Sequence, residues 1–148
     1  MASIYTAALM EHNAHPDYKY EMDDPTCTQD GVSPSCGDDL TLALRLNGDV
    51  IEEAAFTGQG CAVCQADTDT MADLNTGETV DEARRLSSLY LDMIKGRPLT
   101  DEERADLDEA AELASIARMP ARVKCAELAW RTLEKLLERE TAAGREAR

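Results

Sequence analysis

The sequence predicts an α+β fold: a single domain in which a small antiparallel β-sheet carries helices packed mainly on one face. The first observation is the Asn47-Gly48 hairpin turn, which lies in the first half of the chain. The second is the series of amphipathic helical segments that follows it. The third is a composition rich in Ala and Leu with a single Phe and a single Trp, which favours a helix-rich core over an aromatic-filled β-sandwich. At 148 residues the chain is long enough for one ordinary domain and short for two.

The N-terminal part is expected to contain one helix, a long loop and the hairpin. Residues 2–12 place apolar side chains at helical spacing, with Ser3 as the candidate cap. Residues 13–39 are rich in Pro, Asp, Gly and Ser, so they predict a loop with one short strand near residues 26–29. Two apolar-biased runs flank the turn and predict the paired strands, residues 40–46 and 50–56.

The C-terminal part predicts four helices, because glycines, prolines and a capping-box pattern divide its apolar periodicity into segments. Their expected bounds are about 61–75, 80–95, 100–117 and 121–142. Residues 96–120 carry no obvious chemistry and are interpreted as a lobe or insertion within the single domain 1–148. Residues 143–148 are expected to form a frayed tail.

The charge of the chain excludes some classes of partner. The net charge is −15, with 30 acidic against 15 basic residues. Binding to nucleic acid or to an anionic membrane requires clustered Lys and Arg, so neither is an expected partner. The acidity suits docking on a basic partner, or merely solvates the surface. No signal peptide or membrane span is recognised, and a cytoplasmic location is expected.

The five cysteines point to metal binding or thiol chemistry, because an odd number without a secretion signal argues against a disulfide framework. Cys36, Cys61 and Cys125 all fall at the ends of predicted elements. A bend at Gly37 would aim Cys36 and Asp38 at one point. Three thiolates and one carboxylate suit zinc, or iron when sulfide is present. From spacing alone the alternative stays open that the three cysteines are small buried hydrophobic residues.

Three cysteine motifs in register resemble the U-type iron–sulfur cluster scaffold family (IscU, SufU and the NifU N-terminal domain). The stretch SPSCGD resembles that family's N-P-x-C-G-D motif, with Ser33 in place of its Asn. The stretches LTLALRLNGDVIEEAAFTGQGCAVCQAD and MPARVKCAELAW are similar to its second and third cysteine motifs, and the resemblance covers roughly residues 2–138. The insertion, the Lys124 that precedes Cys125 and the absence of an L-P-P-V-K motif resemble the SUF-type branch.

The resemblance implies an iron–sulfur cluster assembly protein that accepts persulfide sulfur from a SUF-type cysteine desulfurase and passes it toward the SUF machinery. It implies a zinc ion at Cys36, Asp38, Cys61 and Cys125, with Cys36 as the sulfur acceptor. The three cysteines would also hold a transient [2Fe-2S] or [4Fe-4S] cluster. Such a protein is a scaffold or, at most, a zinc-dependent sulfurtransferase. The competing interpretation is a zinc-stabilised structural or redox-sensing domain that transfers no sulfur, since the cysteines and the aspartate alone fit both.

Other residues are expected to play smaller parts. Cys64 stands one helical turn after Cys61 and is interpreted as a buried thiol, with a spare ligand or a resolving thiol as the alternative. Cys27 lies outside the motifs and is interpreted as incidental. His12 and His15 are expected at the surface or at a helix end rather than as ligands. Lys124 and Arg122 are candidates for the rim of the site, and Trp130 is expected in the core with a partner for its indole N–H.

Overall fold

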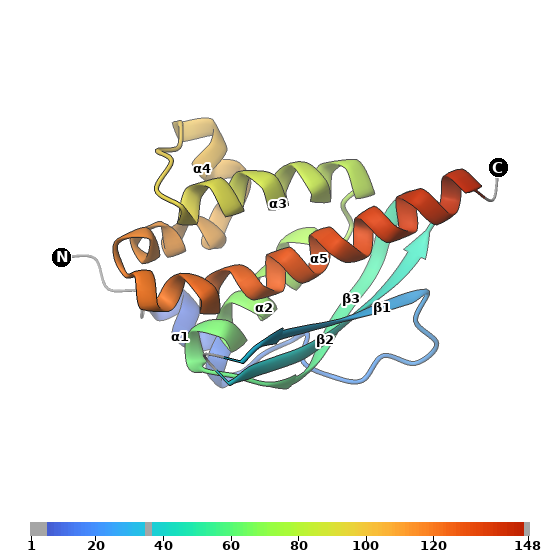
Figure 1. Cartoon of the computed structure of the whole chain (residues 1–148), viewed down its shortest axis with the longest axis horizontal. Helices are drawn as coiled ribbons and strands as arrows, with labels where there is room; N and C mark the ends of the chain where they lie inside the picture. Colours follow the sequence, from blue (N-terminus) through green and yellow to red (C-terminus); the bar gives the residue numbers. More distant parts are fainter. Residues whose placement is uncertain (1–5, 35–36, 147–148) are drawn as a thin grey trace.

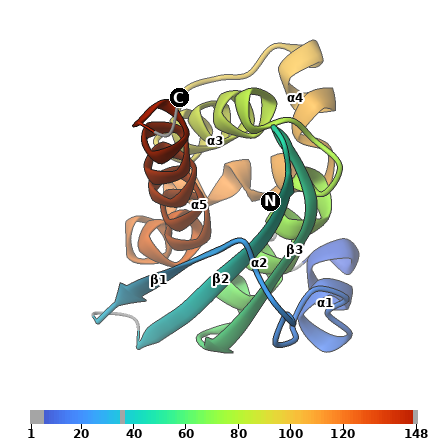
Figure 2. The same cartoon turned by 90° about the vertical axis from the view of Figure 1, so that its right-hand side faces the viewer.

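The computed structural model describes residues 6–34 and 37–146, with side chains as far as residue 141. It contains a three-stranded antiparallel sheet, in the order β1-β2-β3, with helices mainly on one face (Figures 1 and 2). This confirms the α+β prediction. The strands are β1 (Cys27–Ser33), β2 (Asp38–Asn47) and β3 (Val50–Gln59). The helices are α1 (Ala7–Ala14), α2 (Ala62–Asn75), α3 (Val80–Ile94), α4 (Asp101–Leu107), the 3₁₀ helix η1 (Asp108–Arg118) and α5 (Pro120–Glu146).

The predicted hairpin supplies the central strand β2 and the edge strand β3. Asn47 pairs with Val50 across the turn, where Gly48 has a φ of 63°. Both strands are longer than predicted, because pairing continues to Asp39 opposite Gln59. The extension requires the glycine at position 58: it has a φ of 117°, and a Cβ atom there would lie 2.2 Å from the backbone oxygen of Asp39.

Strand β1 is also longer than the short strand that the sequence predicts. It has little apolar alternation of its own and pairs with β2 from Cys27 opposite Leu44 to Ser33 opposite Asp38. Its other support is α5, which runs along the strand. The two elements approach closely at Gly31, where a Cβ atom would lie 2.1 Å from the Oγ1 of Thr132. Pairing and packing therefore make this segment a strand.

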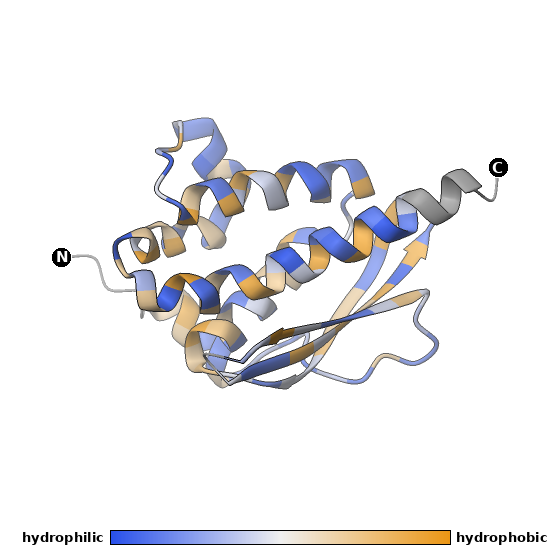
Figure 3. Ribbon diagram, in the orientation of Figure 1, coloured by the Kyte–Doolittle hydropathy of each residue, from blue (hydrophilic) through white to orange (hydrophobic). Residues whose placement is uncertain are grey.

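The core lies between the sheet and the helices. Leu40, Leu42 and Leu44 alternate along β2 and point toward the helices, where each is at most 1% exposed. Trp130 of α5 and Tyr90 of α3 stack with their ring centroids 4.4 Å apart and are fully buried. Figure 3 shows apolar residues along the strands and the helices above them, whereas α4 is largely hydrophilic.

The helix predictions for residues 61–75 and 80–95 are confirmed by α2 and α3. The first helix differs: it begins after the cap Thr6, and the predicted cap Ser3 lies outside the described residues. The helix predicted over residues 100–117 divides into α4 and η1 at Asp108, whose φ is 49°. In η1 the buried side chains recur every third residue, which matches the three residues per turn of a 3₁₀ helix; they are Ala110, Leu113 and Ile116.

The last helix, α5, begins at Pro120 and continues to Glu146, beyond the predicted end near residue 142. A proline in the first helical position costs no hydrogen bond, since that N–H would have no partner in the helix. Among the described residues, no helix combines the length and the apolar character needed to cross a membrane.

Candidate metal centre

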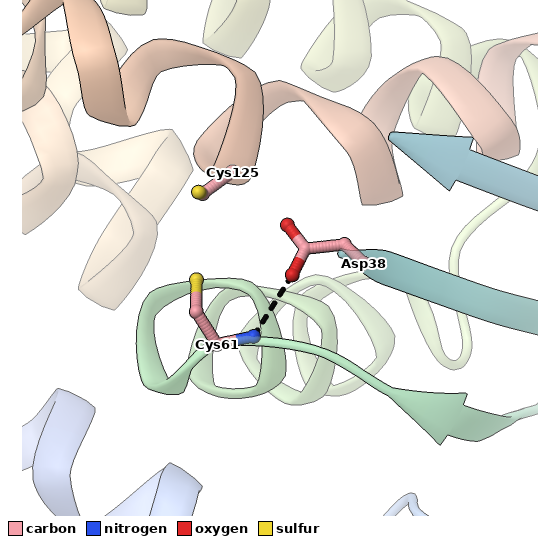
Figure 4. Close-up of side chains that lie close together, drawn as sticks. All are labelled: Asp38, Cys61 and Cys125. Carbon is pink, nitrogen blue, oxygen red and sulfur yellow. Dashed lines mark hydrogen bonds between the residues drawn. The ribbon is translucent and has the colours of Figure 1, made fainter. Parts of the chain in front are cut away.

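Three of the four predicted metal ligands converge where β2, α2 and α5 meet (Figure 4). One oxygen of Asp38 and the sulfur atoms of Cys61 and Cys125 all lie within 4.8 Å of one another. Two ligand atoms on one tetrahedral zinc ion are about 3.5–3.8 Å apart, because Zn–S and Zn–O bonds are about 2.3 and 2.1 Å long. A small closing movement of the side chains would therefore suffice. The fourth predicted ligand, Cys36, lies outside the described residues.

Asp38 is the first residue of β2 and is almost completely buried, at 1% exposure. The bend that the sequence predicts before it is present, since Gly37 has a φ of 70°. The Oδ1 atom accepts a hydrogen bond of 2.8 Å from the backbone N–H of Cys61. The Oδ2 atom is buried and has no hydrogen-bond partner among the described residues. A buried carboxylate oxygen without a partner is costly, so this atom is suited to a ligand from outside the chain.

Cys61 occupies the N-cap position of α2 and is partly exposed. Its sulfur accepts a hydrogen bond from the backbone N–H of Cys64 at 3.4 Å, as a capping side chain does. The residue before it must be small: a Cβ atom on Gly60 would lie 2.7 Å from the Oδ1 of Asp38 and 3.3 Å from the sulfur of Cys64. The predicted position of Cys61 at the start of this helix is confirmed.

Cys125 is buried on α5 and points toward the other two donors (Figure 4). The sequence places it near the first turn of the last helix. Because α5 begins at Pro120, Cys125 lies in the second turn and away from the helix N-terminus. The helix dipole therefore assists Cys61 but not Cys125.

Cys64 is fully buried on the first turn of α2, beside the three donors. Burial raises the pKa of its thiol, and the negative charges of Asp38 and Asp67 raise it further. Cys27 is also buried, but it pairs with Leu44 at the end of the sheet far from Asp38. Burial, helped by the charge of Glu140, raises the pKa of Cys27 to about 12.

Buried polar side chains link α2, α3 and α5 near the donors. Trp130 donates a hydrogen bond of 3.0 Å from its indole Nε1 to the Oδ1 of Asp67, which confirms the expectation that this indole finds a partner in the core. Tyr90 donates its hydroxyl proton to the backbone oxygen of Ala126 at 2.8 Å. Burial raises the pKa of Asp67 well above its ordinary value, although the hydrogen bond from Trp130 acts in the opposite sense. The sequence did not predict that Asp67 would be buried, because an aspartate within a helix is usually exposed to solvent.

His12 joins three elements instead of binding at the donor cluster. Its Nδ1 lies 2.6 Å from the Oδ2 of Asp69 on α2, and its Nε2 lies 2.5 Å from the Oε2 of Glu109 on η1. Burial lowers the pKa of His12, but the hydrogen bonds and charges of these two carboxylates outweigh it, so the net pKa is raised. His15 is exposed and forms the C-cap of α1.

The two candidate rim cations are exposed on the first turns of α5. Lys124 lines a groove of about 290 Å³ between β1 and α5, which also contains Arg131 and Lys135. Arg122 is not among the residues that line this groove.

The fold and the converging donors define the class of protein. The chain belongs to the family of NifU-like N-terminal domains, which matches residues 4–126. The resemblance to U-type iron–sulfur cluster scaffolds that the cysteine motifs indicate is thereby confirmed.

Among particular relatives, the chain is 33% identical over 138 residues to the zinc-dependent sulfurtransferase SufU of Bacillus subtilis, covering 93% of this chain and 92% of that protein. It is 31% identical over 140 residues to the iron–sulfur cluster assembly scaffold protein IscU of Streptococcus pyogenes, covering 95% and 86% of the two chains. A crystal structure from Fervidobacterium islandicum superposes with a TM-score of 0.84 at 30% identity, covering 90% of this chain and 96% of that one. That protein is described as a proposed iron–sulfur cluster assembly scaffold for the SUF system.

Proposed function

We propose that this protein works in iron–sulfur cluster assembly, holds a zinc ion at Cys36, Asp38, Cys61 and Cys125, and accepts sulfur from a SUF-type cysteine desulfurase on Cys36. The observation that carries the proposal is the convergence of Asp38, Cys61 and Cys125 from three separate elements, with the Oδ2 of Asp38 buried and unpartnered within the described part of the chain. The similarity to the zinc-dependent sulfurtransferase SufU and to the scaffold protein IscU supports the same function.

The chemistry of the donors favours zinc. Thiolate sulfur is a soft ligand and carboxylate oxygen a hard one, and zinc accepts both in four-coordinate sites. When bound, the metal would hold the cysteine sulfur atoms as thiolates. The proposed set fills four positions, so no position is left for the water that a zinc hydrolase requires.

The position of Cys36 in the chain supports its place in this set. One residue, Gly37, separates it from Asp38, so covalent geometry limits the distance between the Cα atoms of Cys36 and Asp38 to about 7 Å. Cys61 is the N-cap of α2 and Cys125 belongs to α5, whereas Cys36 stands in the sequence between the end of β1 at Ser33 and the start of β2 at Asp38.

The proposed reaction is a single sulfur transfer. The Cys36 thiolate attacks the outer sulfur of a persulfide on the desulfurase, and a new S–S bond forms at Cys36. The S–S bond of the donor breaks, and the donor cysteine leaves as a thiolate while the proton of the persulfide travels with the transferred sulfur. No oxidant or reductant is consumed. The net charge of −15 would speed the encounter with a basic face of the desulfurase, and this effect should weaken with rising salt.

Tryptic mapping tests the acceptor directly, because trypsin places the cysteines on different peptides. Cys27 and Cys36 fall within 20–45, Cys61 and Cys64 within 46–84, and Cys125 within 125–131. After incubation with a cysteine desulfurase and cysteine, we expect one additional sulfur atom on peptide 20–45.

Two matched variants assign the sulfur within that peptide. Cys27→Ser should retain the added sulfur, and Cys36→Ser should lose it. Sulfur that stays on peptide 20–45 in Cys36→Ser, or that settles on another peptide in the wild type, would refute the assignment. A protein that gains no sulfur and contains no metal after anaerobic purification would refute the proposed function.

A further inference from the structure

Two cysteines stand three positions apart at the start of α2, in the sequence Cys61-Ala-Val-Cys64. Both cysteines are free thiols in this structure. Cys61 is the N-cap and is partly exposed, whereas Cys64 lies in the first turn and is fully buried. The pair therefore combines one sulfur that a reagent can reach with one that only an intramolecular reaction can reach.

The geometry of the pair suits a disulfide bond. Residues three apart on a helix have Cα atoms about 5 Å apart, and disulfides span about 4.4–6.8 Å between Cα atoms. The sulfur of Cys61 already turns toward Cys64, because it accepts the Cys64 N–H at 3.4 Å. Helical side chains point toward the N-terminus of their helix, and the sulfur of Cys64 accordingly lies beside Gly60, 3.3 Å from the position of a Cβ atom there.

The surroundings of Cys64 set it apart from a core cysteine such as Cys27. The sulfur of Cys64 and the Oδ1 of Asp38 both face Gly60, since a Cβ atom there would lie 3.3 Å from the sulfur and 2.7 Å from the oxygen. One turn further along α2, Asp67 is fully buried and its Oδ2 has no hydrogen-bond partner within the described structure. Buried side chains of α2 next to the donor cluster therefore include one thiol, Cys64, and one carboxyl group, Asp67.

We infer that Cys61 and Cys64 form a reversible dithiol–disulfide couple that exchanges with low-molecular-weight disulfides and withdraws Cys61 from the metal site. In the first step the Cys61 thiolate attacks one sulfur of the small disulfide, a mixed disulfide forms, and one small thiolate leaves. In the second step Cys64 attacks the Cys61 sulfur, the bond to the small molecule breaks, and the second small thiolate leaves with the Cys64 proton. Two protein thiols are oxidised and one small disulfide is reduced to two thiols.

The pairing rests only on the positions of the two cysteines, and only its effect on the metal rests on the proposed function. A disulfide would occupy the Cys61 sulfur and leave Asp38, Cys125 and Cys36 as the remaining proposed ligands. Thiolate is the ligand form of cysteine, so oxidation should lower metal affinity and couple metal release to the redox state.

The test uses the protein as purified, with glutathione disulfide as the probe. After oxidation, unfolding and alkylation, peptide 46–84 should lack both alkyl groups and weigh two hydrogen atoms less than its reduced, unalkylated form. A chromogenic chelator in the same sample should report zinc release. Cys64→Ser should stop at the mixed disulfide, so that its peptide 46–84 carries one glutathione instead of an internal disulfide, because Cys64 is the group that displaces the small thiol. Cys27→Ser is the matched control and should behave like the wild type.

Two outcomes would overturn the inference. One is a crosslink from peptide 46–84 to peptide 125–131 or 20–45 as the main product. The other is a Cys64 that remains alkylatable after Cys61 has been oxidised. The pairing and the proposed function can fail separately: an unpaired Cys64 with normal sulfur transfer to Cys36 rejects only the pairing, and a normal pairing without sulfur transfer rejects only the proposed function.

Discussion

Replacing Gly60 with alanine should weaken the proposed metal centre without replacing any proposed ligand. The added Cβ atom would lie 2.7 Å from the Oδ1 and 3.2 Å from the Cγ of Asp38. Ordinary contacts of a Cβ atom begin near 3.4 Å, so the carboxylate must move by about 0.7 Å to restore one. That movement acts directly on the hydrogen bond of 2.8 Å that Oδ1 accepts from the Cys61 N–H.

The expected cost follows from that hydrogen bond. A hydrogen bond to a charged group contributes about 1.5–3 kcal/mol, and here the carboxylate is buried. If Asp38 binds the metal through Oδ2, as we propose, the same displacement misplaces the ligand. Metal affinity should then fall by about ten- to a hundredfold, since about 1.4 kcal/mol corresponds to a tenfold change.

Competition with a chromogenic zinc chelator measures this affinity, and a double-mutant cycle isolates the cause. In the Asp38→Ala background the Cβ atom of Gly60→Ala meets no carboxylate, so the second substitution should have little further effect. If Gly60→Ala costs as much without Asp38 as with it, or if the single variant binds zinc like the wild type, the proposed contact does not support the site.

Three further predictions concern the rest of the molecule. Cys61→Ser should reduce zinc content after anaerobic purification, whereas Cys27→Ser should leave it unchanged; metal analysis that finds equal zinc in both would remove Cys61 from the site. Trp130→Phe should lower the free energy of unfolding by about 3 kcal/mol, because it leaves Asp67 buried without its indole donor; denaturant titration that finds under about 1 kcal/mol would contradict this. The raised pKa of His12 means that its stabilisation is fully present below its ordinary pKa of 6.5 and is lost as pH rises through the raised pKa; the stability difference between wild type and His12→Gln should therefore shrink toward alkaline pH, and a difference that does not change with pH would show that the charge on His12 is immaterial.

The sequence predicted the hairpin and the helices α2 and α3, because turn and capping residues close to each element determine where it begins and ends. The Asn47-Gly48 turn needs a positive φ, and the caps and glycine stops that delimit α2 and α3 act within a few residues. The convergence of Asp38, Cys61 and Cys125 was predictable for a different reason, namely the family resemblance of the three motifs. Spacing alone left open whether the cysteines were donors or core residues.

The features that the sequence did not predict depend on contacts between distant segments. Strand β1 exists because it pairs with β2 and because Gly31 admits Thr132 of α5. The break at Asp108 depends on a positive φ that aspartate only sometimes adopts. Asp67 is polar in the sequence, and nothing local indicates that the side chain of Trp130 will cover it.

The order in which the donors are synthesised has a consequence for when metal can bind. Asp38 and Cys61 belong to the first half of the chain, but Cys125 belongs to its last helix. A domain folds as a unit, and α5 must dock on β1 before Cys125 reaches the other two donors. A growing chain therefore lacks the complete set of donors until its final helix has folded, so under the proposed function nascent chains should not compete with finished molecules for scarce metal.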